Sequence, residues 1–336
     1  MVALMRESRA MNWPWPLPLL RAARNSTLKF AFPSLTHICS SSSSHSGGRI
    51  ASLQLNETQV IINKKPMRII QPGDVDEVLE MYISEDRLDG DPYWCRVWPS
   101  AIALAEEILN HPQTVKGLRV CELGAGLGLG GLAATISGAA DVVLYDREPF
   151  ALLCALLTIH ANCPGVVTNL ASVLQLCSSQ VSLTLPCGIP NLPYETAMSA
   201  CIKDPTSLLA ESIVKGMSGS LEVRAELFDW TCSQNTFPFD VVLASDVLYD
   251  KMAIPFLTNV IPRLLRKGSK ASLLLTDPVH RTPENREMFL NLLKSSTTSQ
   301  LVVHQGDPVC SVSRRNPEME GRLHDVELIL MKTGNI

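Results

Sequence analysis

The sequence predicts a doubly wound α/β fold: a mostly parallel seven-stranded sheet with one antiparallel strand, helices on both faces and an N-terminal β-hairpin extension. From residue 118 onward, apolar runs typical of buried strands alternate with helical patterns, which indicates a parallel sheet covered on both faces. The last two strand patterns, at 300–305 and 324–332, follow one another without a helix, so an antiparallel strand is expected there. Earlier, residues 53–72 alternate like two strands turned at 63–66, which predicts the hairpin.

The remaining elements follow in chain order. A short acidic helix is expected within 74–88, and a second helix within 100–111, where Pro112 lies just beyond the last helical residue. The strands of the main alternation are expected at 118–124, 141–146, 221–230, 239–250 and 270–278. The helices that separate and follow them are expected at 129–138, 149–162, 253–266 and 283–294.

Composition divides the chain into three parts. Residues 1–50 hold six basic residues and one acid, end in a serine-rich run and have prolines in their apolar part. This composition favours a transit peptide for a mitochondrion or chloroplast over a secretory signal, and an unstructured tail of a cytoplasmic protein is the alternative. Residues 51–112 then form a hairpin and helical extension, and 113–336 form the α/β domain. Weak periodicity at 164–220 predicts a loop insertion.

Charge and cysteine usage exclude several classes of partner. The formal net charge of -4 gives no electrostatic reason to expect nucleic acid. The ten cysteines form no CxxC pair, which argues against a metal site and a disulfide framework. The longest apolar run, 150–161, is too short to cross a bilayer, so no membrane partner is expected.

A glycine-rich turn follows the first strand of the α/β domain and predicts a nucleotide-like ligand. The stretch "ELGAGLGLGG" places five glycines within residues 124–131, directly after Glu122. The strand ends just before Gly124, so Gly124, Ala125 and Gly126 form the first tight turn. An acid there would repel the pyrophosphate of a dinucleotide but favours S-adenosylmethionine, which carries a positive sulfonium and ammonium. A solvated Glu122 beside glycines that only allow close packing is the alternative.

Acidic residues at the next two strand ends suit a nucleoside. Asp146 ends the second strand, 20 residues after Gly126, where a carboxylate can accept both ribose hydroxyls. Asp229 ends the third strand and could accept a hydrogen bond from the adenine amino group, with Trp230 as a flat apolar wall. A helix-capping Asp146, and a core tryptophan beside a capping Asp229, are the alternatives.

The fourth strand ends in "SDVLYD" and predicts the reactive part of the site. Ser245, Asp246 and Tyr249 lie at the carboxyl edge of the sheet beside the glycine turn, where open α/β sheets bind ligands. Asp246 and Tyr249 are therefore expected to face the methyl acceptor. A helix-capping aspartate and a buried tyrosine are the alternative. The stretch "HRTPENR" at 280–286 is interpreted as a solvated loop, with a rim that contacts substrate as the alternative.

Together these motifs resemble class I, seven-β-strand S-adenosylmethionine-dependent methyltransferases, and more narrowly a plant-type member of family 16, largely protein-lysine methyltransferases. The resemblance rests on "RVWPSAIAL", "ELGAGLGLGG", Asp146, "FDW" and "SDVLY", the last matching the family motif D/E-x-x-Y/F. It implies S-adenosylmethionine as cofactor, a protein lysine as substrate, Trp98 and Ser245 among the cofactor contacts, and Asp246 and Tyr249 at the incoming amine. "PYWCRVWP" and "LLLTDPVHR" are similar to a mitochondrial branch that methylates the electron-transfer flavoprotein β-subunit.

Two other functions stay open at this point. A methyltransferase for a small molecule or nucleic acid is the first, although enzymes that methylate adenine or glutamine show D/N-P-P-Y/F where this chain has Asp246-Val247-Leu248-Tyr249. A non-catalytic homologue that retains the cofactor is the second.

Overall fold

A computed structural model provides the structure of the protein. It describes residues 51–177 apart from 88, then 181–186, 221–232, 238–267, 271–278 and 281–295, and the backbone of short strands after residue 300. The chain divides into two units, residues 1–50 and 51–336. The first unit, with the expected transit peptide, lies outside the described residues, as does residue range 187–220 of the expected insertion.

A seven-stranded sheet in the order β6-β4-β3-β7-β8-β12-β9 forms the centre of the second unit. Its first five strands are parallel, β12 is antiparallel to β8, and β9 is antiparallel to β12. This arrangement confirms the predicted doubly wound sheet with one antiparallel strand. The strands span Arg119–Leu123 (β3), Asp141–Asp146 (β4), Glu222–Leu227 (β6), Val241–Ser245 (β7), Ser272–Pro278 (β8), Leu301–His304 (β9) and Val326–Thr333 (β12).

Alternation along each strand divides the buried side chains between two hydrophobic cores. In β4, Val142 and Leu144 belong to one core, and Val143 and Tyr145 belong to the other. Successive side chains of a strand point to opposite faces, so both faces of the sheet are covered by apolar packing. The strand order reverses at β3, which pairs with β4 on one side and with β7 on the other. The carboxyl ends of these three parallel strands therefore lie side by side, and the candidate site lies there.

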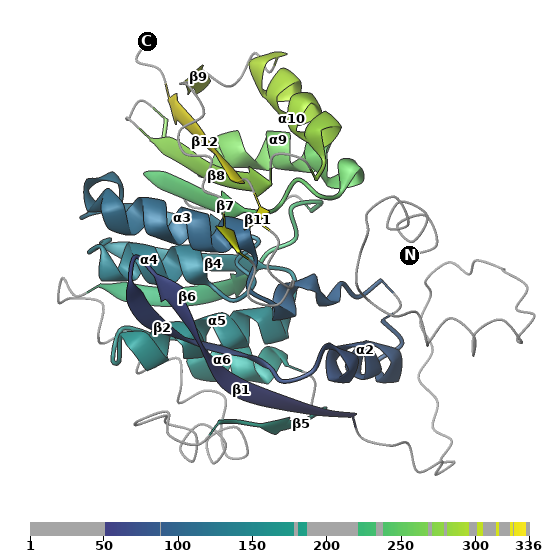
Figure 1. Ribbon diagram of the computed structural model, residues 1–336. Coiled ribbons are helices and arrows are strands. Elements are labelled where there is room, and N and C mark those ends of the chain that lie inside the picture. The colour runs from purple at the N-terminus through teal and green to yellow at the C-terminus, as the bar shows by residue number, and fades with distance from the viewer. Residues whose placement is uncertain are drawn as a thin grey trace, which may run out of the picture. The chain divides into compact units, whose positions relative to one another are not determined.

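Helices cover both faces of this sheet (Figure 1). One layer contains α3 (Pro99–Asn110), α4 (Leu129–Ile136) and α5 (Pro149–Asn162), and the other contains α9 (Ile254–Leu264) and α10 (Pro283–Ser295). Although the sequence assigns α3 to the extension, it packs directly against α4 and β8. Seven residues of α3 are buried in this packing. The extension and the α/β domain therefore share one hydrophobic core.

The N-terminal hairpin is present and lies on α5. It consists of β1 (Ala51–Ile62) and β2 (Lys65–Pro72), and its two turn residues, Asn63 and Lys64, both have positive φ, as type I′ hairpin turns require. Thr158 and Asn162 of α5 accept hydrogen bonds from the β2 backbone at 3.0 Å each. The expected acidic helix follows as α2 (Val75–Ser84), with Asp74 as its N-cap.

The predicted loop insertion contains regular structure that its weak periodicity did not indicate. Helix α6 (Leu170–Leu176) packs against α5, and β5 (Val181–Thr184) pairs parallel with β1, which completes the sheet β2-β1-β5. Both elements are short, so their hydrophobic pattern covers too few residues to be recognised. A further two-stranded pair joins β10 (Arg314–Arg315) and β11 (Leu323–His324). No helix in the described part of the chain is long and apolar enough to span a bilayer.

Candidate active site

Alternate residues of the turn between β3 and α4 have a backbone conformation that favours glycine. Gly124, Gly126 and Gly128 all have positive φ, at 66°, 51° and 74°, which glycine adopts without steric cost. A Cβ added to Gly124 would lie 3.0 Å from Val247 and 3.4 Å from the Trp230 ring. The turn and the ends of neighbouring strands thus form one close-packed surface.

Glu122 stabilises this turn through the backbone of α4. Its side chain is completely buried, and its two oxygens accept hydrogen bonds from the amides of Gly130 and Gly131, at 3.1 and 2.8 Å. The solvated alternative is therefore wrong, because the carboxylate is buried and accepts from free N–H groups of the first turn of α4, and the cofactor contact of Glu122 stays a prediction. Burial raises the pKa of Glu122 to about 7, against the opposing effect of the two amides.

Asp146 connects the glycine turn with the turn that follows β4. One carboxylate oxygen accepts from the Gly126 amide at 2.9 Å, and the other accepts from the Glu148 amide at 3.0 Å. The residue is partly exposed at the carboxyl edge of the sheet. Burial raises its pKa to about 6, and the carboxylates of Glu148 and Asp91 add to this effect. The structure therefore brings Asp146 and the glycine turn together, as expected for a ribose site.

The end of β6 contributes Trp230 and Asp229, both partly exposed. The ring of Trp230 packs against the glycine turn at Gly124, so the expected apolar wall lies at the site. Asp229 accepts two hydrogen bonds from Thr231, from its amide at 2.8 Å and its hydroxyl at 2.6 Å, and both end on Oδ1. The predicted capping role of Asp229 is present, and its contact with adenine stays a prediction.

At the end of β7, Asp246 has an unusual backbone conformation. Its φ is +59°, and its amide donates to the carbonyl of Thr276 on β8 at 2.9 Å. Ser245, the last residue of β7, pairs with the same Thr276 and is partly exposed. Aspartate tolerates the left-handed region better than most residues, yet such a conformation carries strain that often marks functional sites.

The carboxylate of Asp246 forms an ion pair with Arg281. Both side chains are almost inaccessible, at 7% and 16% exposure, and the guanidinium carbon lies 5.9 Å from the ring centres of both Trp98 and Tyr249. The interpretation of 280–286 as a solvated loop is therefore wrong for Arg281. Burial lowers the pKa of Arg281 to about 10, so it keeps its charge at neutral pH.

Tyr93 completes the aromatic surroundings of this ion pair. Its ring meets the ring of Trp98 edge-on at 6.0 Å and that of Tyr249 at 6.2 Å. We call the group of Tyr93, Trp98, Asp246 and Tyr249 the acceptor site, and the contact of Trp98 with the cofactor stays a prediction. Its chemistry, three aromatic rings around a carboxylate, is suited to a cation.

The hydroxyl of Tyr249 donates to Asp91 Oδ2 at 2.6 Å. Burial and this carboxylate raise the pKa of Tyr249 well above its ordinary value, so the residue stays a neutral phenol. From α10, the Asn285 amide group donates to the carbonyls of Leu248 and Tyr249, at 2.8 and 3.3 Å. Asp91 was not expected from the sequence, whereas Asn285 lies in the 280–286 stretch for which a rim that contacts substrate was the alternative.

A buried polar network holds the extension against the cofactor side of the site. Glu148 Oε2 accepts from the Tyr82 hydroxyl at 2.9 Å and from Arg87 at 2.6 Å, and Tyr82 in turn accepts from the Trp94 indole at 2.8 Å. The Trp94 carbonyl lies 3.7 Å from the position of a Cβ on Gly126. The 3₁₀ helix η3 (Pro92–Cys95) and Trp98 are thereby fixed beside the glycine turn.

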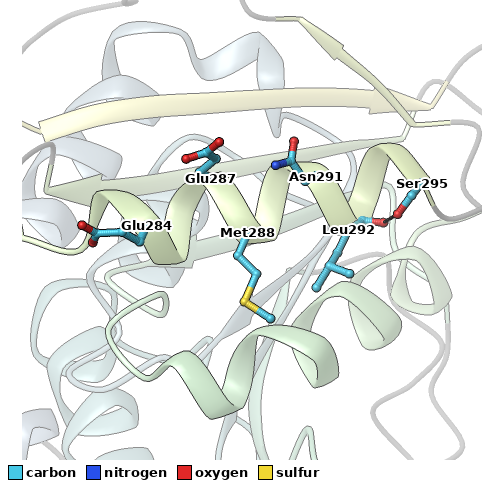
Figure 2. A pocket seen from close by; sticks show the side chains of 6 residues that line it. All are labelled: Glu284, Glu287, Met288, Asn291, Leu292 and Ser295. Atoms are coloured by element: carbon cyan, nitrogen blue, oxygen red, sulfur yellow. Dashed lines mark hydrogen bonds between the residues drawn. The ribbon is translucent and has the colours of Figure 1, made fainter.

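A separate groove of about 530 Å³ runs along α10. Figure 2 shows Met288 and Leu292 pointing from α10 toward the helix packed beneath it, while Glu287 and Asn291 point to the opposite side. None of the predicted site residues lines this groove. No group of three or more potential metal ligands is clustered within the described ranges.

The sequence profile of a family described as "Lysine methyltransferase" matches residues 77–176 and 200–296, more than half of the 336 residues. The chain belongs to this lysine methyltransferase family. The two matched segments contain every residue of the glycine turn, the acceptor site and Arg281. The plant-type detail of the resemblance stays a prediction.

Curated relatives are similar over a shorter segment. The "Electron transfer flavoprotein beta subunit lysine methyltransferase" of Danio rerio is 40% identical over 72 residues, which is 21% of this chain and 28% of that protein. The Homo sapiens protein of the same name is 38% identical over 72 residues, with the same two shares. "Protein N-lysine methyltransferase METTL21A" of Danio rerio is 43% identical over 68 residues, 20% of this chain and 30% of that protein. The aligned segments thus span less than a third of these relatives.

Among solved structures, an S-adenosylmethionine-dependent methyltransferase from Mesorhizobium loti aligns over 68% of this chain and 97% of its own chain. The sequence identity is 13% and the TM-score is 0.35. The N-methyltransferase NodS from Bradyrhizobium japonicum covers 69% and 98%, at 11% identity and a TM-score of 0.36. Likeness at this level says nothing about the ligand or substrate of this chain.

Proposed function

We propose that this protein transfers a methyl group from S-adenosylmethionine to the side-chain amine of a lysine in a protein substrate. The observation that carries the proposal is the acceptor site, a carboxylate among three aromatic rings that already holds a cation beside the glycine turn. Family membership supports the reaction class.

The cofactor side has the shape and charge that this cofactor needs. A Cβ on Gly124 would press on Val247 and the Trp230 ring, so this glycine keeps the turn packed against the apolar wall that would hold the adenosyl group. The Asp146 carboxylate keeps acceptor capacity for ribose hydroxyls, because each of its oxygens accepts one backbone hydrogen bond and has a second lone pair. When bound, S-adenosylmethionine supplies an electrophilic methyl group on a sulfonium, and the leaving thioether is neutral.

The protein's own contribution is positioning and deprotonation of the amine. A free lysine has a pKa of about 10.4, and the aromatic rings of Trp98 and Tyr249 would lower it by removing water. Asp246 attracts and orients the ammonium before the proton leaves for solvent. Tyr249 cannot act as the base, since its phenol keeps its proton. Positioning of the two reactants can contribute about 7–11 kcal/mol in favourable cases.

The test is transfer of tritiated methyl from S-adenosylmethionine by the full chain. The first substrate to offer is the electron transfer flavoprotein beta subunit, which the names of the curated relatives contain, followed by organellar and cytosolic extracts. Labelled methyl-lysine in a protein hydrolysate would support the proposal, with Asp246→Asn as the inactive control. Label in nucleic acid or small molecules, or no label despite measurable cofactor binding, would contradict it.

We also propose that residues 1–50 direct the protein to a mitochondrion or chloroplast. The support is their basic, serine-rich and acid-poor composition. A fluorescent protein fused behind residues 1–50 should accumulate in one organelle, and the full chain should follow it. A diffuse cytoplasmic signal from both fusions would contradict the proposal.

A further inference from the structure

The acceptor site of the protein is filled by one of its own side chains. Arg281 lies between β8 and α10, and its guanidinium donates to Asp246 Oδ1. It stands 5.9 Å from the ring centres of Trp98 and Tyr249. A lysine ammonium would make the same kinds of contact, a charged hydrogen bond to the carboxylate and cation–π contacts with the rings.

The ion pair that Arg281 forms is incomplete. Among the described residues, Asp246 Oδ2 and Arg281 Nε are both buried and have no hydrogen-bond partner. A guanidinium can satisfy both oxygens of a carboxylate through two parallel N–H bonds. Arg68 does so in this chain, where its Nε and a terminal nitrogen donate to the two oxygens of Glu57 at 2.7 and 2.6 Å. Arg281 therefore leaves one buried acceptor oxygen of Asp246 for another donor.

An ammonium can use the oxygen of Asp246 that Arg281 leaves without a donor. Its three N–H donors diverge from one atom, so a lysine amine can address both oxygens of Asp246 from one position. Two cations cannot occupy the acceptor site together, because they would repel each other and compete for one carboxylate. The Arg281 side chain has several rotatable bonds, so it can leave the site without a change in the fold.

We propose that Arg281 is a built-in competitor of the substrate: it occupies the acceptor site of the free protein, and the substrate lysine must displace it. This inference rests on the proposed function, since it assumes that the site that Arg281 occupies is the one that binds the substrate lysine. Arg281 then lowers the apparent affinity for every amine, because binding requires the open state. Only a lysine that is held by further contacts with the substrate protein would displace it efficiently.

Amine binding can be measured without methyl transfer. The probe is n-butylammonium, titrated into the full chain and followed by the fluorescence of Trp98, with Trp98→Phe as the spectroscopic blank. Arg281→Gln, which keeps most of the side-chain length without the charge, is expected to bind the probe at least tenfold more tightly than the wild type. Arg281→Lys is the matched control, because it keeps a cation and should bind as weakly as the wild type.

Further variants show that the gain occurs at Asp246. Asp246→Asn in the Arg281→Gln background should abolish the gain, and Arg281→Ala gives a second uncharged variant in case the glutamine substitution disturbs folding. Equal probe affinity in the wild type and in both uncharged variants would overturn the inference.

Steady-state kinetics with a protein substrate separate this inference from the proposed function. Arg281→Gln should lower the KM for the substrate severalfold and leave kcat within about twofold. A fall in kcat with unchanged KM would overturn the inference, since Arg281 would then position Asp246. If the wild type forms no methyl-lysine but the variant gains amine affinity, the proposed function alone fails. If the wild type forms methyl-lysine and the variant gains no amine affinity, this inference alone fails.

Discussion

The cofactor side and the acceptor side of the site are assembled in different ways. On the cofactor side, Glu122 and Asp146 lie at the ends of two adjacent strands. Their carboxylates accept hydrogen bonds from backbone amides of the glycine turn and of the first turn of α4. The acceptor site combines side chains from 93–98 and 246–249 and receives Arg281 from a third segment. The first side is held in shape by local backbone geometry, whereas the second depends on tertiary contacts and holds a competing charge.

Because the two sides are built differently, substitutions on each side should change different measured quantities. Changes on the cofactor side should alter cofactor affinity or stability, because that side is part of the packed backbone. Changes on the acceptor side should alter turnover and leave cofactor affinity intact.

Asp246→Asn should lower turnover by about 100- to 1000-fold, because the amine loses the charge that attracts and orients it. Cofactor affinity measured by calorimetry should stay within about twofold. The matched control is Asp250→Asn, since Asp250 caps the short helix at 251–253 only four residues further along and should leave turnover unchanged. Equal losses of affinity and turnover in Asp246→Asn would contradict this separation of effects between the two sides.

Glu122→Gln should flatten the pH dependence of stability. Burial raises the pKa of Glu122 from 4.5 to about 7, so between these pH values the folded protein keeps a proton that the unfolded chain releases. The wild type therefore loses stability as pH rises through this window, by up to about 3 kcal/mol at about 1.4 kcal/mol per pKa unit.

The measurement is the free energy of unfolding in denaturant at pH 5 and pH 8, without cofactor. The variant starts lower, because glutamine has one acceptor oxygen for the two amides of Gly130 and Gly131. Its loss between the two pH values should nonetheless be smaller than that of the wild type. The raised pKa of Asp146 adds the same loss of stability with rising pH to the wild type and to the variant. Parallel curves would show that Glu122 does not titrate in this range.

Gly124→Ala should weaken cofactor binding at least tenfold. Its added Cβ would lie 3.0 Å from Val247 and 3.4 Å from Trp230, at a φ of +66°. Gly117→Ala is the matched control, because Gly117 has a φ of +70° but no atoms within 4 Å of the added Cβ. Both variants should lose about 1–2 kcal/mol of stability from the left-handed backbone, yet Gly117→Ala should bind cofactor normally. A similar loss of affinity in both would mean that backbone strain alone is responsible.

Asp91→Asn should lower kcat by about tenfold or less, since it weakens one hydrogen bond to the Tyr249 hydroxyl. Tyr249→Phe should have a similar effect, and the double variant should be little worse than either single one. Additive losses in this double-mutant cycle would show that the two residues act separately.

The sequence was sufficient to predict the sheet and to place Gly124, Asp146 and Trp230 near one another, because strand ends and turns are recorded in short contiguous patterns. The strand-turn-helix stretch around Gly124 and the acid after β4 can be recognised without any tertiary contact. The burial of Glu122 was not expected, since it depends on the first turn of α4, whose amides the carboxylate caps.

The acceptor side could be predicted only in part. Asp246 and Tyr249 follow a strand end, but Asp91 and Arg281 reach them from positions 158 and 35 residues away. Neither residue belongs to a periodic pattern, so only the packing of η3 and the start of α10 brings them there. The short elements α6 and β5 escaped prediction because seven and four residues are too few to show a period.

The most direct test of the two-sided site is a crystal structure of the full chain with S-adenosylhomocysteine. The ribose hydroxyls should lie within about 2.6–3.2 Å of the Asp146 carboxylate, with the adenosyl group against Trp230 and the sulfur facing Asp246 and the aromatic rings of the acceptor site. A ligand bound away from Asp146, or oriented with its sulfur away from Asp246, would contradict the account.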